Sequence, residues 1–291
     1  MNERVRRRWL AAGAGLLMAC AESPLGDPQG AMVLVGAGDI AACGSDGDEA
    51  TAAILDDIAG TVFTTGDNAY PDGTAADFAS CYAPSWGRHK ARTRPSPGNH
   101  DYHTTDAAGY FGYFGAAAGP AGLGYYSYDV GAWHVVALNS NIDMDSGSPQ
   151  EQWLRADLAA TGKHCTLAYW HHPRFSSGSN HGSSTRSHDV WVALYEHGAE
   201  VVLAGHEHHY ERFGPQTPDG NADPAQGIRE FVVGTGGAGP YPFGQPLANS
   251  EVRSTGIYGV LKLTLRDEGY EWEFVPAAGE TFRDAGTGTC H

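Results

Sequence analysis

Short apolar blocks separated by turn residues dominate the hydrophobic pattern of this chain. Residues 125–139 indicate two strands joined near Gly131. The last third of the chain predicts mainly strands. The apolar blocks expected to form buried strands cover residues 32–37, 61–65, 166–170, 201–204, 231–233, 258–265 and 270–275.

Polar residues mark the ends of the expected helices. Asp48 is expected to cap a helix that runs to Ile58. Ser148 begins a second helix, because the run Ser-Pro-Gln-Glu supplies a capping hydroxyl, a proline in the first turn and a glutamate three residues after the cap. Gly162 ends that helix. A third helix is expected over residues 185–197, closed by the glycine that follows.

The order of these elements predicts the fold class. Strands alternate with helices in the first two-thirds of the chain, residues 71–97 are expected to be irregular, and strands dominate the end. This pattern favours an α/β (α+β) fold in which two sheets pack together with helices outside. With 291 residues, 41% of them hydrophobic, the chain is large enough for one globular domain, expected over residues 31–291.

The first thirty residues predict export. A basic start precedes an apolar run, residues 10–19, that is too short to span a bilayer comfortably. Residues 17–20, Leu-Met-Ala-Cys, then resemble a bacterial lipobox, which implies a signal peptide over residues 1–19 and lipid attachment to Cys20. The alternative is an ordinary secretory signal with a chance cysteine. Residues 20–30 are expected to be a tether.

These signals predict the location of the protein. It is expected to be exported and lipid-anchored at the bacterial cell envelope, or otherwise periplasmic or secreted. Membrane attachment is expected only through the N-terminal lipid. Because the first expected strand begins near Met32, no extra N-terminal domain is expected before the one predicted over residues 31–291.

Charge excludes one class of partner. The chain carries a formal net charge of −16, and removal of residues 1–19 takes away four arginines and one glutamate, leaving −19. So acidic a surface repels the phosphates of duplex nucleic acid. A small phosphate substrate is not excluded, because the charge of bound metals dominates the field in a cleft.

Apart from Cys20, four cysteines are present, an even number that suggests two disulfides in an exported protein. Three pairings are possible. Cys43 and Cys81 both follow strand-like segments in expected loops, which favours Cys43–Cys81 and Cys165–Cys290. A tetrathiolate zinc site is the alternative, but no Cys-x-x-Cys spacing supports it.

Polar side chains that bind metals follow several of the expected strands. Together they offer carboxylate, amide and phenol oxygens and several imidazoles, enough for two metal ions, a recurring device for hydrolysing phosphate esters. Singly, each segment is an ordinary turn, and fourteen histidines make chance pairs common. The five segments are Gly38-Asp39, Gly66 to Tyr70, Gly98 to Asp101, His171-His172-Pro173 and Gly205 to His208.

The order and flanks of these segments resemble the calcineurin-like metallophosphoesterases, and within them the single-domain bacterial type of purple acid phosphatase, over most of residues 33–275. Gly66-Asp67-Asn68-Ala69-Tyr70 and residues 205–212 are the most specific parts. Most of the wider family has Asp-x-His in the first segment, whereas Ile40 and Ala41 follow Asp39 here. In the purple acid phosphatases a tyrosine replaces that histidine, and Tyr70 stands at the corresponding place.

The resemblance implies a four-layer αββα sandwich of two mixed sheets and a dinuclear metal site. His171 is chosen over His172 because the family pattern is His-x-Pro. The first metal is expected to be Fe³⁺, since a phenolate is a hard anionic ligand, and the second Fe²⁺, Zn²⁺ or Mn²⁺. The implied ligands are Asp39, Tyr70 and His208 for one metal, Asn99, His171 and His206 for the other, and Asp67 for both.

The resemblance also implies hydrolysis of phosphomonoesters by a metal-activated hydroxide, with a proton supplied to the leaving oxygen. His100 and His181 are the candidate acids, because imidazole titrates near neutrality. His181 is alternatively a solvated loop residue. A phosphodiesterase or nucleotide phosphatase, and a metal-stabilised binding protein without activity, are competing interpretations. Four further residues are expected to support ligands or line the substrate mouth: Asp101, Tyr102, His103 and His172.

Overall fold

Two β-sheets lie at the centre of the computed structural model, which describes residue 1 and residues 31–291. The first has the strand order β15-β14-β13-β1-β3-β5 and the second the order β12-β10-β11-β9-β8-β7-β6. The strands of the first sheet are β1 (Met32–Ala37), β3 (Thr61–Thr65), β5 (Thr93–Ser96), β13 (Gly259–Arg266), β14 (Gly269–Pro276) and β15 (Ala285–Thr289). Those of the second are β6 (Tyr126–Val130), β7 (Trp133–Ala137), β8 (Cys165–Tyr169), β9 (Val201–Ala204), β10 (Tyr210–Phe213), β11 (Arg229–Val233) and β12 (Ser250–Ser254).

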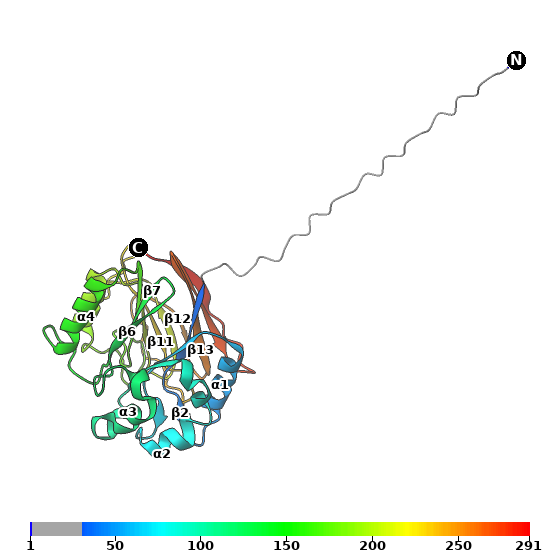
Figure 1. Cartoon of the computed structure of the whole chain (residues 1–291), viewed down its shortest axis with the longest axis vertical. Helices are drawn as coiled ribbons and strands as arrows, with labels where there is room; N and C mark the ends of the chain where they lie inside the picture. Colours follow the sequence, from blue (N-terminus) through cyan, green and yellow to red (C-terminus); the bar gives the residue numbers. More distant parts are fainter. Residues whose placement is uncertain (2–30) are drawn as a thin grey trace.

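Helices cover the outer faces of the sheets. Figure 1 shows α4 (Pro149–Ala160) on one side of the two sheets and α1 (Gly47–Asp57) on the other. The helix α5 (His188–Glu196) lies beside α4. The structure thus has the mixed α/β arrangement of sheets and flanking helices that was predicted. Shorter helices are α2 (Ala75–Asp77), η1 (Phe78–Tyr82), η2 (Trp86–Arg92), η3 (Asp101–His103), η4 (Thr105–Ala107), α3 (Ala108–Phe114) and η5 (Gly115–Ala118).

Strand β8 contributes side chains to both hydrophobic clusters, one between the sheets and one under the helices. Its five residues are all buried, and successive side chains point to opposite faces. Leu167 and Tyr169 join the cluster between the sheets, whereas Ala168 joins the cluster under the helices with Leu154 of α4 and Trp191 of α5. A strand covered on both faces needs apolar residues throughout, which is why its sequence does not alternate.

Parallel pairing brings the functional turns together. Strands β1, β3 and β5 are parallel neighbours, as are β8, β9 and β11, so their carboxyl ends meet at one edge of each sheet. The N–H of Gly38 donates to the carbonyl of Val233 at 3.0 Å and joins the two edges. The two-stranded sheet of β2 (Ala41–Ala42) and β4 (Ala69–Tyr70) extends the same region.

The start of α1 differs from the expectation. The helix begins at Gly47, and Asp48 lies inside its first turn. The cap position is Asp46, whose side chain makes no capping bond, and the Oγ of the preceding Ser45 accepts the N–H of Gly47 at 3.1 Å. A carboxylate in the first turn still interacts favourably with the positive end of the helix, so Asp48 resembled a cap in the sequence.

The cap of α4 is confirmed, and the start of α5 differs from the prediction. The Oγ of Ser148 accepts the N–H of Glu151 at 3.2 Å, and the helix ends at Ala160. The carboxylate of Glu151 binds the N–H of Gly147 at 3.0 Å. Helix α5 starts at His188, three residues later than expected.

Residues 71–97 are more ordered than expected. They contain three short helical segments and the strand β5, which pairs with β3. Strand β5 has the sequence Thr-Arg-Pro-Ser, without an apolar run, and Pro95 is tolerated because β5 is the edge of its sheet. Cys81 lies in the helical segment η1 and not in a loop. The helix α3 and the strands β10, β12 and β15 were also not predicted. The sequences of β12 and β15 are polar or glycine-rich and lack an apolar run.

Both predicted disulfides are present, Cys43–Cys81 and Cys165–Cys290. They are compatible with an oxidising compartment outside the cytoplasm. Among residues 31–291, no helix combines the length and hydrophobicity that a membrane span requires. The predicted signal peptide, the tether and the lipidation site Cys20 lie outside the described residues.

Candidate metal centre

The proposed ligands sit on turns that follow neighbouring strands. Asp39 follows β1, Asp67 follows β3, Asn99 follows β5, His171 follows β8 and His206 follows β9. Tyr70 is in β4 and His208 precedes β10. The structure therefore brings the whole predicted set to the region where the carboxyl ends of both sheets meet.

The backbone is strained at three of these ligands. Asp39, Asp67 and His206 have φ values of 59°, 49° and 70°, a left-handed conformation that few residues other than glycine adopt. Three further non-glycine residues among those described share it. Such conformations persist where the surrounding structure holds them in place, and they cluster at functional sites.

Two glycines are needed for the turns to approach one another. A Cβ atom on Gly98 would lie 2.1 Å from Oδ1 of Asp67, and one on Gly205 would lie 2.7 Å from Oδ2 of Asp39. Any larger residue would push these carboxylates away from the centre. Steric contact with these carboxylates thus explains why glycine occupies both motif positions.

The first half of the site surrounds the phenol of Tyr70. Its hydroxyl oxygen lies 3.1 Å from Oδ1 of Asp39, 3.1 Å from Oδ2 of Asp67 and 3.1 Å from Nε2 of His208. Nε2 of His208 is also 3.3 Å from Oδ1 of Asp39. Asp39 and Asp67 are buried, so these oxygen and nitrogen atoms face one another away from bulk water.

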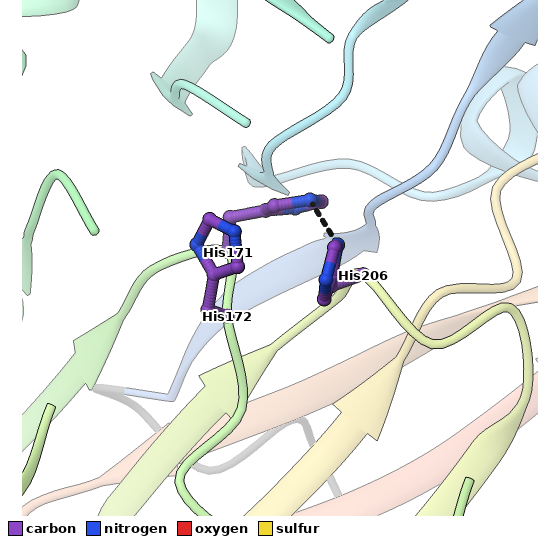
Figure 2. A group of neighbouring side chains, drawn as sticks. All are labelled: His171, His172 and His206. Atoms are coloured by element: carbon purple, nitrogen blue, oxygen red, sulfur yellow. Dashed lines mark hydrogen bonds between the residues drawn. The ribbon is translucent and has the colours of Figure 1, made fainter. Parts of the chain in front are cut away.

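The second half surrounds the imidazole of His171. Its Nε2 lies 3.0 Å from Oδ1 of Asn99, 3.1 Å from Nδ1 of His206 and 3.3 Å from Oδ2 of Asp67. Figure 2 shows the His171 and His206 rings meeting edge to face, with the contact between their nitrogens dashed. The oxygen Oδ2 of Asp67 therefore belongs to both halves.

Backbone carbonyls fix two of the ring orientations. Nδ1 of His171 is 2.8 Å from the carbonyl of Thr65, and Nδ1 of His208 is 2.6 Å from the carbonyl of Gly239. A carbonyl only accepts, so each Nδ1 carries the hydrogen and the lone pair of a neutral ring is on Nε2, facing the centre. This is the usual arrangement of histidines that bind metals.

The donor set fits metal cations. Around His171 Nε2 the neighbours are an amide oxygen, a carboxylate oxygen and a second imidazole nitrogen, which are all lone-pair atoms. A proton on Nε2 of His171 could be donated to one of these atoms at a time, whereas a cation could bind all of them at once. Two groups of possible ligands lie within reach of a single ion each, Asp39–Asp67–His171 and His171–His172–His206.

The pKa values reflect the same crowding. Burial acts to lower the pKa of His171, but the carboxylate of Asp67 outweighs it and raises the pKa to about 9. Burial acts to raise the pKa of Asp67, yet His171 and His100 hold it well below its usual range. Burial, with Asp39 and Asp67 nearby, raises the pKa of the Tyr70 phenol. Burial and the neighbouring His171 lower the pKa of His206.

His172 also lies near the site, with a different set of contacts. Its Nδ1 is 2.7 Å from the hydroxyl of Ser140, and its ring centre is 4.4 Å from that of His206. Burial, together with His171, lowers the pKa of His172 to about 3. His171, in contrast, contacts Asn99 and Asp67 directly, which favours it as the ligand.

His100 lies over the Tyr70 side of the site. Its Nδ1 is 2.5 Å from the carbonyl of Pro71, and its Nε2 is 3.9 Å from Oδ2 of Asp67. The ring packs against that of Tyr70, with centres 4.4 Å apart. Its free nitrogen therefore faces the carboxylate shared by both halves. His103 packs on the far side of His100 and pairs with Asp72 at 3.0 Å.

Asp101 and Tyr102 lie behind the ligands. Buried Asp101 accepts the N–H of Gly98 at 2.8 Å and the side-chain amide of Asn68 at 2.9 Å, so it joins the turns that carry Asn99 and Asp67. Burial, with Asp67 nearby, raises the pKa of Asp101 to about 7. The hydroxyl of Tyr102 accepts from the amide of Asn139 at 2.8 Å and has no hydrogen bond to a proposed ligand among the described residues.

The second candidate acid, His181, packs against His206, whereas His100 packs against Tyr70. The exposed ring of His181 stacks on that of His206 with centres 4.1 Å apart. Tyr241 was not predicted from the sequence; its ring stacks on His208 at 3.8 Å with 10° between the planes. No local pattern signals Tyr241, because it follows His208 by thirty-three residues in an irregular segment.

Comparison with known families agrees with this geometry. The family model described as calcineurin-like phosphoesterase matches residues 25–210. The chain therefore belongs to the calcineurin-like phosphoesterase family. Within it, the chain is similar to purple acid phosphatases. Purple acid phosphatase 22 of Arabidopsis thaliana is 37% identical over 119 residues, which are 39% of this chain and 27% of that protein.

Solved structures support the fold. A purple acid phosphatase, PPD1 from yellow lupin (Lupinus luteus) seeds, superposes with a TM-score of 0.69 at 19% identity, over 88% of this chain and 53% of that one. GAP50, described as the anchor in the inner membrane complex of Plasmodium, has a TM-score of 0.69 at 13% identity, over 90% of this chain and 89% of that one. The chain spans about a quarter to a third of the length of the curated relatives it matches.

Proposed function

We propose that this protein hydrolyses phosphomonoesters at a dinuclear metal centre. The observation that carries the proposal is the position of Asp67. Its Oδ2 lies 3.1 Å from the Tyr70 hydroxyl in one half of the site and 3.3 Å from His171 Nε2 in the other. A carboxylate oxygen shared by two clusters of ligand atoms is what a bridge between two cations requires.

The ligand set divides around this bridge. Asp39, Tyr70 and His208 would hold one metal, and Asn99, His171 and His206 the other. The phenol of Tyr70 favours Fe³⁺ in the first position, while amide and imidazole ligands accept Fe²⁺, Zn²⁺ or Mn²⁺ in the second. When bound, such a metal pair supplies a clamp for the phosphate and a nucleophile from water at neutral pH.

The remaining step, protonation of the leaving oxygen, belongs to side chains of the chain itself. His100 and His181 pack against different members of the ligand set, one against Tyr70 and the other against His206. The carbonyl of Pro71 fixes the hydrogen of His100 on Nδ1, which leaves Nε2 to exchange a proton with substrate. His181 is exposed and is the second candidate.

A substrate panel with quantified metals tests the proposal. We expect about two metal ions per chain after purification without chelators, and faster turnover of p-nitrophenyl phosphate than of bis(p-nitrophenyl) phosphate. Asp67→Asn is expected to abolish turnover. A metal-free protein, or full activity of Asp67→Asn, would refute the dinuclear mechanism. Preference for the diester would favour the phosphodiesterase interpretation.

The N-terminal pattern leads to a separate proposal on location. The chain is exported, and lipid on Cys20 holds it at the cell envelope. Detergent-phase partitioning of the full chain, compared with Cys20→Ser, tests this. Release of the variant into the aqueous phase is expected. Identical partitioning of both proteins would favour an ordinary secretory signal.

A further inference from the structure

A buried carboxylate lies between two of the proposed ligands. Glu207 separates His206 from His208, and its side chain has no exposed surface. Its hydrogen-bond partners are backbone groups: Oε1 accepts the N–H of His181 at 2.6 Å and that of Gly182 at 2.5 Å. Oε2 has no hydrogen-bond partner in the described part of the chain. Burying a carboxylate with one oxygen unpaired costs folding free energy, so the position of Glu207 needs an explanation.

The chain wraps closely around this carboxylate. A Cβ atom on Gly178 would lie 2.2 Å from the carboxyl carbon of Glu207, so only glycine fits there. Gly182, where the turn leaves the carboxylate, has a φ of 71°. The segment 178–182, which we call the His181 turn, therefore follows the shape of the Glu207 side chain.

The His181 turn carries an imidazole over the site. The ring of His181 stacks on that of His206, with 28° between the planes. Within residues 31–291, the ring nitrogens of His181 have no hydrogen-bond partner, and the residue is exposed. The position of the ring therefore depends on this stacking and on its backbone, whose N–H is bound to Glu207.

Two other buried carboxylates hold the chain before this turn. Glu230 accepts the N–H groups of Arg174 and Phe175, both at 2.9 Å. Glu211 accepts the N–H of Ser177 at 2.8 Å and its hydroxyl at 2.6 Å. Neither contacts His181. Because they anchor the same loop by the same kind of bond, they provide matched controls for Glu207.

We infer that Glu207 is a positioning residue, which holds the His181 turn so that the His181 imidazole stays over His206. The inference rests on the proposed function, since it gives His181 its task at the leaving oxygen. Among the described residues, the Glu207 carboxylate has no hydrogen bond to the imidazole of a proposed ligand, so its effect passes through the turn. Its neighbours in sequence, His206 and His208, are proposed metal ligands, whereas Glu207 binds the backbone of the His181 turn.

Leaving-group dependence distinguishes this role from general support of the fold. Phenyl phosphate needs a proton on its leaving oxygen much more than p-nitrophenyl phosphate does. His181→Ala is expected to lower kcat for phenyl phosphate by about 100-fold, the low end for general acids, with a far smaller loss for p-nitrophenyl phosphate. Glu207→Ala is expected to show the same pattern. In the double variant, Glu207→Ala is expected to lower kcat for phenyl phosphate by less than about threefold beyond His181→Ala alone, because residues that act together have non-additive effects.

Conservative variants separate position from charge. Glu207→Gln keeps a carbonyl oxygen that accepts both N–H groups and is expected to restore most of the phenyl phosphate activity. Glu207→Asp withdraws the carboxylate by one methylene without emptying the site. It is expected to lose more activity on phenyl phosphate than on p-nitrophenyl phosphate, and it replaces Glu207→Ala in the test if the alanine variant does not fold. Glu211→Gln is expected to lower thermal stability while leaving the ratio of the two activities unchanged.

Several results would overturn the inference. Equal losses for both substrates, additive losses in the double variant, or failure of Glu207→Gln to restore activity would each do so. Amide hydrogen exchange at residues 181 and 182 gives a readout that needs no turnover: faster exchange in Glu207→Ala is expected, and unchanged exchange contradicts the inference. A wild-type protein without activity but with this exchange result would refute the proposed function alone.

Discussion

The phenol oxygen of Tyr70 lies 3.1 Å from Nε2 of His208, although the two residues are 138 positions apart in the sequence. The same oxygen is 3.1 Å from carboxylate oxygens of Asp39 and Asp67. One phenol hydrogen serves only one of these three acceptors at a time, whereas a hard cation binds all four atoms. This contact is the observation that most favours the proposed metal in the first half of the site.

Tyr70→Phe therefore tests the identity of that metal. If a phenolate binds Fe³⁺, the pure protein is expected to be coloured, and the variant to lose the visible absorption band and most of its iron. Visible spectroscopy with metal analysis measures both. Tyr102→Phe is the control, because its hydroxyl is bound to Asn139. A colourless, iron-free but active wild-type protein would contradict the iron assignment and leave the family unaffected.

The adjacent histidines are expected to behave differently when replaced. His171→Ala removes a nitrogen that contacts Asn99 and Asp67, and is expected to lower the metal content by about one ion per chain with loss of turnover. His172→Ala breaks a bond to Ser140 and is expected to keep both metals. Metal analysis after gel filtration measures the difference. Equal metal loss in the two variants would make His172 a ligand as well.

Replacing Asp101 is expected to destabilise the turns behind the site. Asp101→Ala leaves the buried N–H of Gly98 without its acceptor and removes one of two acceptors of the Asn68 side-chain amide, which keeps the carbonyl of Ser96. The expected cost is about 3 kcal/mol of unfolding free energy, because each unsatisfied buried donor costs about 1–3 kcal/mol. Urea unfolding of the chelator-treated protein measures it. Asp72→Ala removes an exposed pair with His103 and is expected to change stability by less than about 1 kcal/mol.

Glu200 provides a pH test away from the metal centre. Burial raises the pKa of its carboxyl to about 7, although the N–H groups of Thr166 and His291 act to lower it. A raised pKa means that the stabilising contribution is complete below the unfolded value of 4.5 and is lost as the pH rises through about 7. The loss corresponds to about 3 kcal/mol.

Glu200→Gln removes this dependence. The difference in unfolding free energy between wild type and Glu200→Gln is expected to move in favour of the variant by about 3 kcal/mol between pH 4.5 and pH 8. Denaturant unfolding at a series of pH values measures it. Glu268→Gln, at a side chain that is 88% exposed, is the control. A constant difference across the range would show that Glu200 titrates normally.

Local patterns were sufficient for much of the fold. The apolar block 166–170 and the cap at Ser148 identified a buried strand and a helix, because side-chain periodicity and capping depend on residues close in sequence. The same approach failed at β5. Its Thr-Arg-Pro-Ser sequence becomes a strand only because β3 lies beside it, and pairing partners are not encoded locally.

The sequence by itself determined which chemical groups follow which strands, from Asp39 after β1 to His206 after β9, and which cysteines were available to pair. Only the tertiary structure decided which lone pairs meet. It placed Oδ2 of Asp67 between Tyr70 and His171, tied the rings of the ligands to backbone carbonyls, and brought Glu207 under the His181 turn. The physical reason is that a hydrogen bond depends on distances of a few tenths of an ångström, and these are set by how two sheets pack rather than by the order of residues.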